Sequence, residues 1–161
     1  MIVTNYGPVE AALIKKLTQF KYPYVILVSE VTEALRLHDL DLKVVVGELD
    51  DPETYRLLRT DRAALVATVG NDVMNTNVAF TARGICEDVP IVATAADVAS
   101  VEVLQLAGCT QVLELAEMMG RSLASRVIGR DAQTYVIGQF DDLLIAEASA
   151  ARTPLAWPVT S

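Results

Sequence analysis

The feature that most constrains the fold is a regular alternation of short β-branched runs with helical stretches, which extends from Met1 to Leu113. Such alternation is typical of βαβ units, in which the strands pair in parallel and helices cover both faces of the sheet. The predicted strands are Ile2–Asn5, Tyr24–Ser29, Lys43–Val46, Ala64–Thr68, Ile91–Thr94 and Gln111–Leu113. The predicted helices between them are Pro8–Phe20, Val31–Leu37, Pro52–Arg59, Asn71–Cys86 and Ala96–Ala107. We therefore expect an α/β fold over residues 1–113, a Rossmann-like, doubly wound parallel sheet of six strands.

The pattern changes after Leu113. Residues Glu114–Ile128 are predicted to form a long amphipathic helix, and Phe140–Ala150 a second helix after a break at Gly129. No further strand is expected. We predict that this helix–turn–helix, residues 114–150, is a dimerisation element that buries its apolar side chains against a sister subunit. The alternative is that both helices fold back onto their own sheet.

Composition excludes several classes of protein. At 161 residues the chain has room for one domain. A net charge of −8, with 13 basic residues that form no cluster, argues against a nucleic-acid partner. No apolar run reaches the roughly 18 residues that a membrane span needs.

The compartment and the chain ends follow from simpler signals. The N-terminus has no basic leader or apolar signal core, so we expect a cytoplasmic protein in a reducing environment. Cys86 and Cys109 are then free thiols. Residues 151–161, which include Pro154 and Pro158, are expected to be a connector to a C-terminal region beyond this chain.

The turn after the first predicted strand is where a dinucleotide-binding fold holds a pyrophosphate. Such a turn needs glycines so that backbone N–H groups can approach the phosphates at a helix N-terminus. Here it reads Asn5-Tyr6-Gly7-Pro8-Val9-Glu10, which keeps only the central glycine of the G-x-G-x-x-G pattern. Pro8 removes one donor, and Glu10 places a repelling negative charge in the first helical turn. Two interpretations stay open: a weakened phosphate site, or a plain helix-initiating turn.

Two further strand ends carry acidic groups. Ser29-Glu30 ends the second strand, where an acidic side chain hydrogen-bonds a ribose diol in dinucleotide folds; the alternative is an ordinary exposed glutamate. The third strand ends in Gly47-Glu48-Leu49-Asp50-Asp51-Pro52. Its carboxylates suit a hard cation such as calcium, but we favour the interpretation that Asp50 and Asp51 cap the next helix.

Polar residues also follow the fourth strand, in Thr68-Val69-Gly70-Asn71-Asp72-Val73-Met74-Asn75. Asn71 or Asp72 is suited to cap the helix that follows. Asn75 lies within that helix at a place expected to be buried, where its amide needs hydrogen-bond partners.

No residue pattern indicates catalysis. His38, the single histidine, lies beside Asp39 and Asp41 in a predicted surface helix with no second imidazole or nearby cysteine. We therefore expect a protein that is not an enzyme. An NAD-dependent oxidoreductase, or one half of it, is the alternative, and it would need a substrate domain and a proton-transfer residue.

The order of these motifs resembles the RCK or TrkA-N domain, the cytosolic regulator of potassium channels and of Trk- or Kef-type potassium transport systems. Val46–Pro52 is similar to the family's GD-x-x-x-P segment, with Glu48 in place of the usual aspartate, and Asn71-Asp72-x-x-Asn75 is similar to its D-x-x-N helix start. Val101–Val112 resembles the family's L-x-x-aGAd-x-Vi stretch, and Gly120–Ala124 the start of its crossover helix.

This resemblance implies a ligand-sensing regulatory domain whose last two helices swap between protomers to lock a homodimer, within a larger ring that acts on a membrane pore subunit. It implies a place at the inner face of the cell membrane. It also implies NAD(H), ATP or ADP as possible ligands, although the ligand itself stays unidentified because the glycine motif is degraded. The implied cofactor contacts are Asn5, Tyr6, Gly7, Pro8, Ser29, Glu30, Gly47, Glu48, Thr68 and Asn71. A structural dimerisation module that binds no nucleotide is the alternative function.

Overall fold

The computed structural model describes residues 1–128, 134–140 and 143–148. The chain divides into two compact units, Met1–Leu115 and Ala116–Ser161. Across the described ranges, no helix combines the length and the hydropathy that a bilayer-spanning segment requires.

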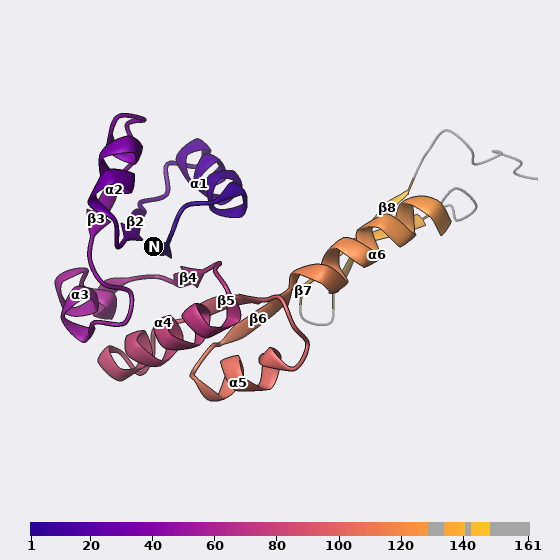
Figure 1. Ribbon diagram of the computed structural model, residues 1–161. Coiled ribbons are helices and arrows are strands. Elements are labelled where there is room, and N and C mark those ends of the chain that lie inside the picture. Colours follow the sequence, from indigo (N-terminus) through magenta and orange to yellow (C-terminus); the bar gives the residue numbers. More distant parts are fainter. Residues whose placement is uncertain (129–133, 141–142, 149–161) are drawn as a thin grey trace, which may run out of the picture. The chain divides into compact units, whose positions relative to one another are not determined.

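The first unit contains the predicted parallel sheet (Figure 1). Its strands are β1 (Ile2–Thr4), β2 (Val25–Val28), β3 (Val44–Val46), β4 (Val66–Thr68), β5 (Ile91–Ala95) and β6 (Gln111–Glu114). They pair in the order β3-β2-β1-β4-β5-β6, and every pairing is parallel. This order confirms the doubly wound architecture: the chain fills one half of the sheet outward from β1 and then returns to β4 beside it.

Five α-helices connect these strands, and a sixth follows β6. They are α1 (Pro8–Gln19), α2 (Val31–His38), α3 (Pro52–Leu57), α4 (Asp72–Ile85), α5 (Ser100–Leu106) and α6 (Leu115–Ile128). Helices α1 and α2 lie on one face of the sheet, whereas α3, α4 and α5 lie on the other (Figure 1). The alternation within β2 shows why, because Ile26 and Val28 pack with α1 and α2 while Leu27 packs with the opposite cluster.

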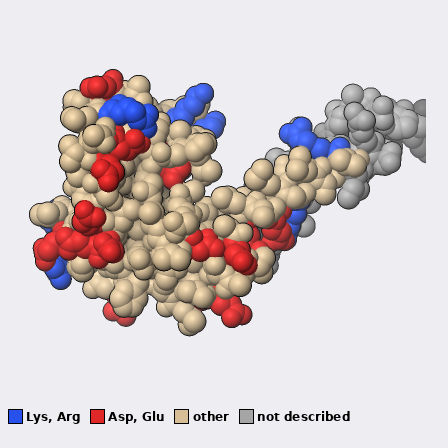
Figure 2. Space-filling model, viewed as in Figure 1, with Lys and Arg blue, Asp and Glu red and all other residues tan. Residues whose placement is uncertain are grey.

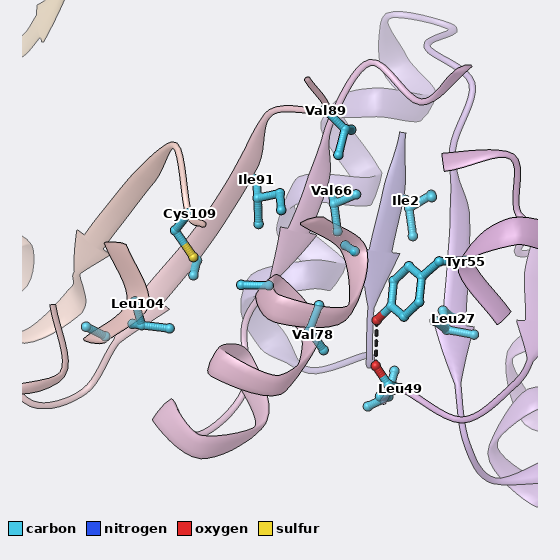
Figure 3. Close-up of a cluster of buried hydrophobic side chains, with 14 residues drawn as sticks. Ile2, Leu27, Leu49, Tyr55, Val66, Val78, Val89, Ile91, Leu104 and Cys109 are labelled. Atoms are coloured by element: carbon cyan, nitrogen blue, oxygen red, sulfur yellow. Dashed lines mark hydrogen bonds between the residues drawn. The ribbon is translucent and has the colours of Figure 1, made fainter. Parts of the chain in front are cut away.

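The larger apolar core lies between the sheet and helices α3, α4 and α5 (Figure 3). Tyr55 is fully buried there, and its hydroxyl donates to the carbonyl oxygen of Leu49 over 2.7 Å. Burial raises the pKa of Tyr55 above its ordinary value, and the nearby negative charge of Asp50 acts in the same direction. The phenol therefore stays protonated and holds the loop after β3 against α3.

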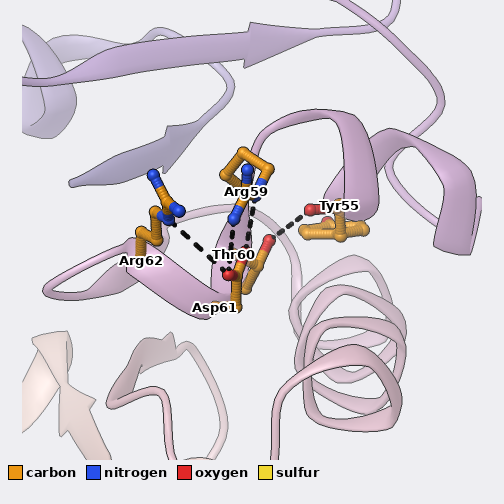
Figure 4. Close-up of polar contacts among 5 residues, drawn as sticks. All are labelled: Tyr55, Arg59, Thr60, Asp61 and Arg62. Carbon is orange, nitrogen blue, oxygen red and sulfur yellow. Dashed lines mark hydrogen bonds and ion pairs between the residues drawn. The ribbon is translucent and has the colours of Figure 1, made fainter.

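A short turn after α3 leads the chain back to β4 (Figure 4). It includes a 3-10 helix, η1 (Thr60–Arg62), preceded by Arg59 in the left-handed conformation with φ 54°. The Thr60 hydroxyl donates to the Tyr55 carbonyl oxygen over 2.7 Å, and Asp61 accepts two bonds of 3.0 Å from the Arg59 guanidinium. These contacts turn the backbone from the end of α3 toward β4.

Arg83 ties the ends of α4 and α5 together. Its guanidinium donates to the carbonyl oxygen of Gly108 over 2.8 Å and to that of Cys86 over 3.3 Å. Gly108 has φ +106°, as expected for the predicted glycine stop after α5. Burial raises the pKa of the adjacent Cys109 thiol to about 11, although the positive charge of Arg83 acts in the opposite direction.

The second unit corrects two predictions about the chain after α6. It contains β7 (Thr134–Phe140) and β8 (Leu143–Ala148), which form an antiparallel pair with an irregularity between Val136 and Gly138. The helix predicted over Phe140–Ala150 is therefore wrong, as is the expectation that no strand follows residue 128. A short apolar run such as Leu143–Ala148 has no clear helical or strand periodicity. The preceding run, rich in β-branched and aromatic residues, provides the strand with which it pairs.

The predicted helix over Glu114–Ile128 is confirmed as α6, with a start one residue later. Its assignment to a dimerisation element stays a prediction. The connector predicted over residues 151–161 lies outside the described residues.

Candidate functional site

The site suggested by the topology is the edge of the sheet at which the parallel strands end. β1 and β4 are neighbours, and the connections that leave their carboxyl ends lead to α1 on one face and α4 on the other. In open α/β sheets, ligands bind in the crevice that opens at such a switch point. The loops that follow β1, β2, β3 and β4 all meet there.

Asn5 starts the first turn in a conformation that glycine usually supplies. Its φ is +63°, and its N–H donates to the Leu27 carbonyl oxygen over 2.8 Å. Asparagine enters the left-handed region more readily than most residues, so Asn5 can occupy the place of the lost first glycine of the motif. The Asn5 side-chain amide donates to the Met74 sulfur over 2.9 Å, which joins the turn to α4.

The end of the turn is closed from within. Gly7 is the N-cap of α1, and its N–H donates to Oε2 of Glu10 over 3.1 Å. Glu10 is only 2% exposed. Pro8 follows Gly7 and has no N–H to offer. The carboxylate therefore lies where the sequence predicted a charge, but it is turned inward onto the glycine that the motif retains.

Tyr6 and the start of α2 border the same turn. The Arg36 guanidinium lies over the Tyr6 ring, 5.9 Å from its centroid, and also donates to Glu33 over 2.6 Å. Glu30 is the exposed N-cap residue of α2, and its side chain makes no capping hydrogen bond to the helix backbone. Its carboxylate is thus accessible, and Ser29 beside it is half-buried.

A cleft of about 320 Å³ opens at this edge. It lies within the range of about 300–1,000 Å³ that small-molecule sites occupy. Polar and apolar side chains share its wall: Ser29, Glu48, Leu49, Asp50, Asn71, Val73, Met74 and Asn77. No lysine or arginine is among these lining residues, so the only formal charges in the wall are negative.

A second hollow of about 430 Å³ lies between α3 and α4 and shares Asp50 and Asn77 with the first. Its remaining lining comes from the two helices, including Arg56 and Phe80. We place the candidate site in the first cleft, because Ser29 and Asn71 belong to the strand-end loops and the second hollow contains neither.

The loop after β3 behaves largely as predicted. Asp51 caps α3, since its Oδ1 accepts the Glu53 N–H over 3.0 Å, while Asp50 faces the cleft instead. A Cβ on Gly47 would lie 2.7 Å from Cγ2 of Thr54, so close packing of β3 on α3 requires glycine there. Glu48 lines the cleft.

Acidic side chains gather over α3 and the loop before it (Figure 2). Within the described part of the chain, however, no group of three or more His, Cys, Asp or Glu residues is arranged to hold a metal ion.

A buried polar network fixes the loop after β4. Thr4 donates to Thr68 over 3.0 Å, and Thr68 donates to Oδ1 of Asn75 over 2.8 Å. The same Oδ1 accepts the Gly70 N–H over 2.8 Å, and the Asn75 amide group donates to the Thr94 carbonyl oxygen over 2.7 Å. Asn75 is fully buried and satisfied, as the sequence required. Thr68 is fully buried too, so it positions the loop and does not face the cleft.

The sequence left open whether Asn71 or Asp72 caps α4, and the structure gives the two residues different roles. Asn71 caps α4 by accepting the Met74 N–H over 2.9 Å, and it also lines the cleft. Asp72 instead accepts the backbone N–H groups of Ala96 and Asp97, over 2.8 and 3.1 Å. The bond from Ala96, then a hydrogen bond from the Ser100 side chain, and then the bond from Asp97 hold the pKa of Asp72 below its usual range.

The structure thus brings three of the predicted contact residues into the cleft wall: Ser29, Glu48 and Asn71. The turn residues Asn5 to Pro8 and the exposed Glu30 border the same sheet edge, whereas Thr68 and Gly47 are packed behind it. Sequence reasoning missed the apolar wall of Leu49, Val73 and Met74. Little in the sequence indicated this wall, because the three residues lie between the polar motif residues and form no apolar run of their own.

These features define a Rossmann-type α/β domain with a cleft at its topological switch point. The family model of the TrkA-N domain matches residues 1–115, so the chain belongs to the TrkA-N domain family, as its motifs predicted.

Solved structures agree with this assignment. A structure of the GsuK channel bound to NAD is similar to the chain with 27% identity and a TM-score of 0.72, covering 86% of this chain and 24% of that one. The GsuK structure bound to ADP shows 30% identity and a TM-score of 0.73, covering 78% of this chain and 33% of that one. The TrkA-N domain of the inner membrane protein ybaL from Escherichia coli shares the fold, at 20% identity and a TM-score of 0.72, covering 78% of this chain and 94% of that one.

The chain therefore spans about a quarter of the GsuK channel chain, 24% of its length. A comparison with curated proteins finds no match.

Proposed function

We propose that this chain is a cytosolic ligand-sensing regulatory domain of a potassium channel or potassium transporter. The observation that carries the proposal is the match of residues 1–115 to the TrkA-N domain together with a cleft at the switch point of the sheet. Similarity to the GsuK channel, which has structures bound to NAD and to ADP, supports the link to potassium flux. The proposed place is the inner face of the cell membrane, beside a pore subunit.

The ligand would enter the cleft at the carboxyl edge of the sheet. Ser29 and Glu30 are placed at the end of β2, where a ribose diol would find acceptors, and Glu48 and Asn71 offer further polar contacts. Val73 and Met74 present an apolar wall suited to a flat ring. We propose the first turn, from Asn5 to Pro8, as the boundary of the site, and Gly47 and Thr68 as residues that shape it from behind.

Regulation would follow from a difference in affinity. A ligand shifts an equilibrium between two assembly geometries only if it binds one of them more tightly, and equal affinity would leave the pore unchanged. Residues 114–150 are proposed to hold two chains together as a homodimer, within a possible larger ring. α6 carries large apolar side chains, Met118, Met119, Leu123 and Val127, for such a contact.

Calorimetric titration of the full chain with NAD(H), ATP, ADP, adenosine and divalent cations tests the proposal. Glu48→Gln removes an ionic acceptor from the cleft and should weaken binding about tenfold or more, because hydrogen bonds to charged groups contribute about 1.5–3 kcal/mol. Glu53→Gln is the matched control, since Glu53 belongs to the same acidic surface but pairs with Arg56 and does not line the cleft. Equal loss in both variants would contradict the site.

Light scattering with and without the ligand tests the assembly. We expect twice the mass of one chain, and a change in dimer geometry or ring size on binding. A strict monomer at high concentration would contradict the role given to residues 114–150.

A structural dimerisation module that binds no ligand is the second candidate. It is favoured by the inward carboxylate of Glu10, which takes up the Gly7 N–H, and by Pro8, which removes another donor. If the wild-type chain binds none of the compounds in the calorimetric titration, this candidate is supported over a sensing role.

A further inference from the structure

Glu10 is a buried carboxylate at the end of the fold where dinucleotides place their phosphates, and it is the capping-box glutamate three residues after the N-cap Gly7. It is 2% exposed and lies in the first turn of α1, which is 12 residues long. Buried carboxylates are costly unless they are paired or hydrogen-bonded. The Glu10 carboxylate accepts a hydrogen bond from the Gly7 N–H, 3.1 Å from Oε2.

The carboxylate lies where an anionic ligand would otherwise be favoured. The N-terminus of a helix carries a partial positive charge and unpaired N–H groups, which attract phosphate. Here the negative charge is supplied by the helix itself. The Gly7 N–H already has an acceptor, and Pro8 has no N–H, so two of the donors that a dinucleotide turn offers are gone.

The charges in the cleft wall also disfavour an anionic ligand. Glu48 and Asp50 line it, and neither lysine nor arginine does. An incoming diphosphate would therefore meet Glu10 at the turn and two carboxylates in the wall, with no cationic side chain from the lining residues to offset them. Like charges placed together in a binding site repel one another and exclude the wrong partner.

We propose that Glu10 is a specificity-determining residue that fills the anion position of the first turn from within, so that the cleft selects an uncharged nucleoside over its phosphorylated forms. This inference rests on the proposed ligand-sensing function and names its ligand class. The ribose would be held at the end of β2 by Ser29 and Glu30, and the base would lie on the apolar wall of Val73 and Met74.

Binding of adenosine, AMP and ADP to the full chain by calorimetry tests this inference. The wild type should bind adenosine at least as tightly as ADP. In Glu10→Ala the affinity for ADP relative to adenosine should rise about tenfold or more, because both the charge and the internal acceptor are removed. Glu10→Gln should lie between the two, since glutamine keeps an acceptor for the Gly7 N–H but has no charge.

Glu102→Ala is the matched control. Glu102 is also in the first turn of a helix, α5, but it is exposed and does not line the cleft. The substitution therefore removes the same charge from the chain without changing the site. The ratio of ADP to adenosine affinity should stay at the wild-type value. Circular dichroism checks that each variant folds, and if Glu10→Ala does not, Glu10→Gln and the wild-type preference decide the matter.

A wild type that binds ADP about tenfold more tightly than adenosine would overturn the inference, as would a ratio that changes equally in Glu10→Ala and Glu102→Ala. Absence of binding in the wild type and in every variant would overturn it too. If only Glu10→Ala binds ADP, the exclusion of phosphate is supported while the nucleoside assignment and the sensing role both fail. If the wild type binds adenosine without any change in assembly, the ligand class stands and the regulatory function fails.

Discussion

Replacing Asn75 with alanine removes the side chain that joins β4, the loop after it and β5 at the edge of the cleft. Asn75 is fully buried in α4, and its amide contacts Thr68, Gly70 and Thr94. Three of the contacted groups are backbone groups: the Gly70 N–H, the Gly70 carbonyl oxygen and the Thr94 carbonyl oxygen. None of these groups has an obvious substitute within the core once the amide is gone.

The expected cost follows from the groups left without partners. Each buried donor or acceptor that loses its hydrogen bond costs about 1–3 kcal/mol. Gly70 is half-buried, so water can reach its N–H and reduce that part of the penalty. We therefore expect Asn75→Ala to lower the free energy of unfolding by about 3 kcal/mol, a large fraction of the roughly 5–15 kcal/mol by which domains are stable.

Urea unfolding followed by far-ultraviolet circular dichroism measures this difference. Asn77→Ala is the control, because Asn77 lies on the same helix but is exposed, and it should change the stability by less than about 0.5 kcal/mol. In parallel, the Gly70 amide should exchange hydrogen faster in Asn75→Ala than in the control. A loss below about 1 kcal/mol, with unchanged Gly70 exchange, would refute the view that this network holds the loop.

Three further predictions concern the region where α4 and α5 end. Gly108→Ala should destabilise the fold by about 1–3 kcal/mol, because φ at Gly108 is +106° and an added Cβ would lie 2.8 Å from Cγ of Arg83. Gly120→Ala is the control and should stabilise α6, because an added Cβ there meets no atom within 4 Å. Thermal melting compares the two variants. Arg83→Met should cost about 1–3 kcal/mol by removing the bonds to the carbonyl oxygens of Gly108 and Cys86, and an unchanged urea midpoint would contradict this. Burial raises the pKa of the Cys109 thiol to about 11 in the folded protein, so the stability gained by keeping this thiol protonated is complete below the unfolded pKa of about 8.5 and is lost as the pH rises through 11. Unfolding measured at alkaline pH should show that loss in the wild type and not in Cys109→Ala. Ellman's reagent should label the half-buried Cys86 before the buried Cys109.

The order of the elements in the first unit could be predicted because it depends on local patterns. Short β-branched runs separated by helical stretches lead to parallel strands, and right-handed crossovers leave few ways to connect them. Proline at the start of α1 and α3, and glycine after α5, marked boundaries that the structure confirms within a few residues. The second unit was predicted less well, since Leu143–Ala148 is too short and too uniformly apolar for its periodicity to separate a helix from a strand.

The candidate site was predictable in position but not in detail. Strand-end residues such as Ser29, Glu48 and Asn71 meet at one edge because parallel strands all end there. The sequence also showed that Asn75 would need partners, but those partners come from β4, the loop after it and β5. Only the packing of the strands decides which of the many polar groups in the chain come within hydrogen-bond distance.

Glu10 shows most clearly which properties follow from the sequence and which depend on the tertiary structure. Its place in the first turn of α1, the loss of the outer glycines and the missing N–H of Pro8 are properties of the sequence alone. Whether its carboxylate faces water or turns back onto Gly7 depends on side-chain rotamer and on the volume left between the helix and the sheet, which no local pattern encodes. The sequence by itself determined the fold class and the sheet edge at which we propose a ligand site. The tertiary structure decided which charges lie inside that edge, because burial and hydrogen bonding depend on neighbours that are distant along the chain.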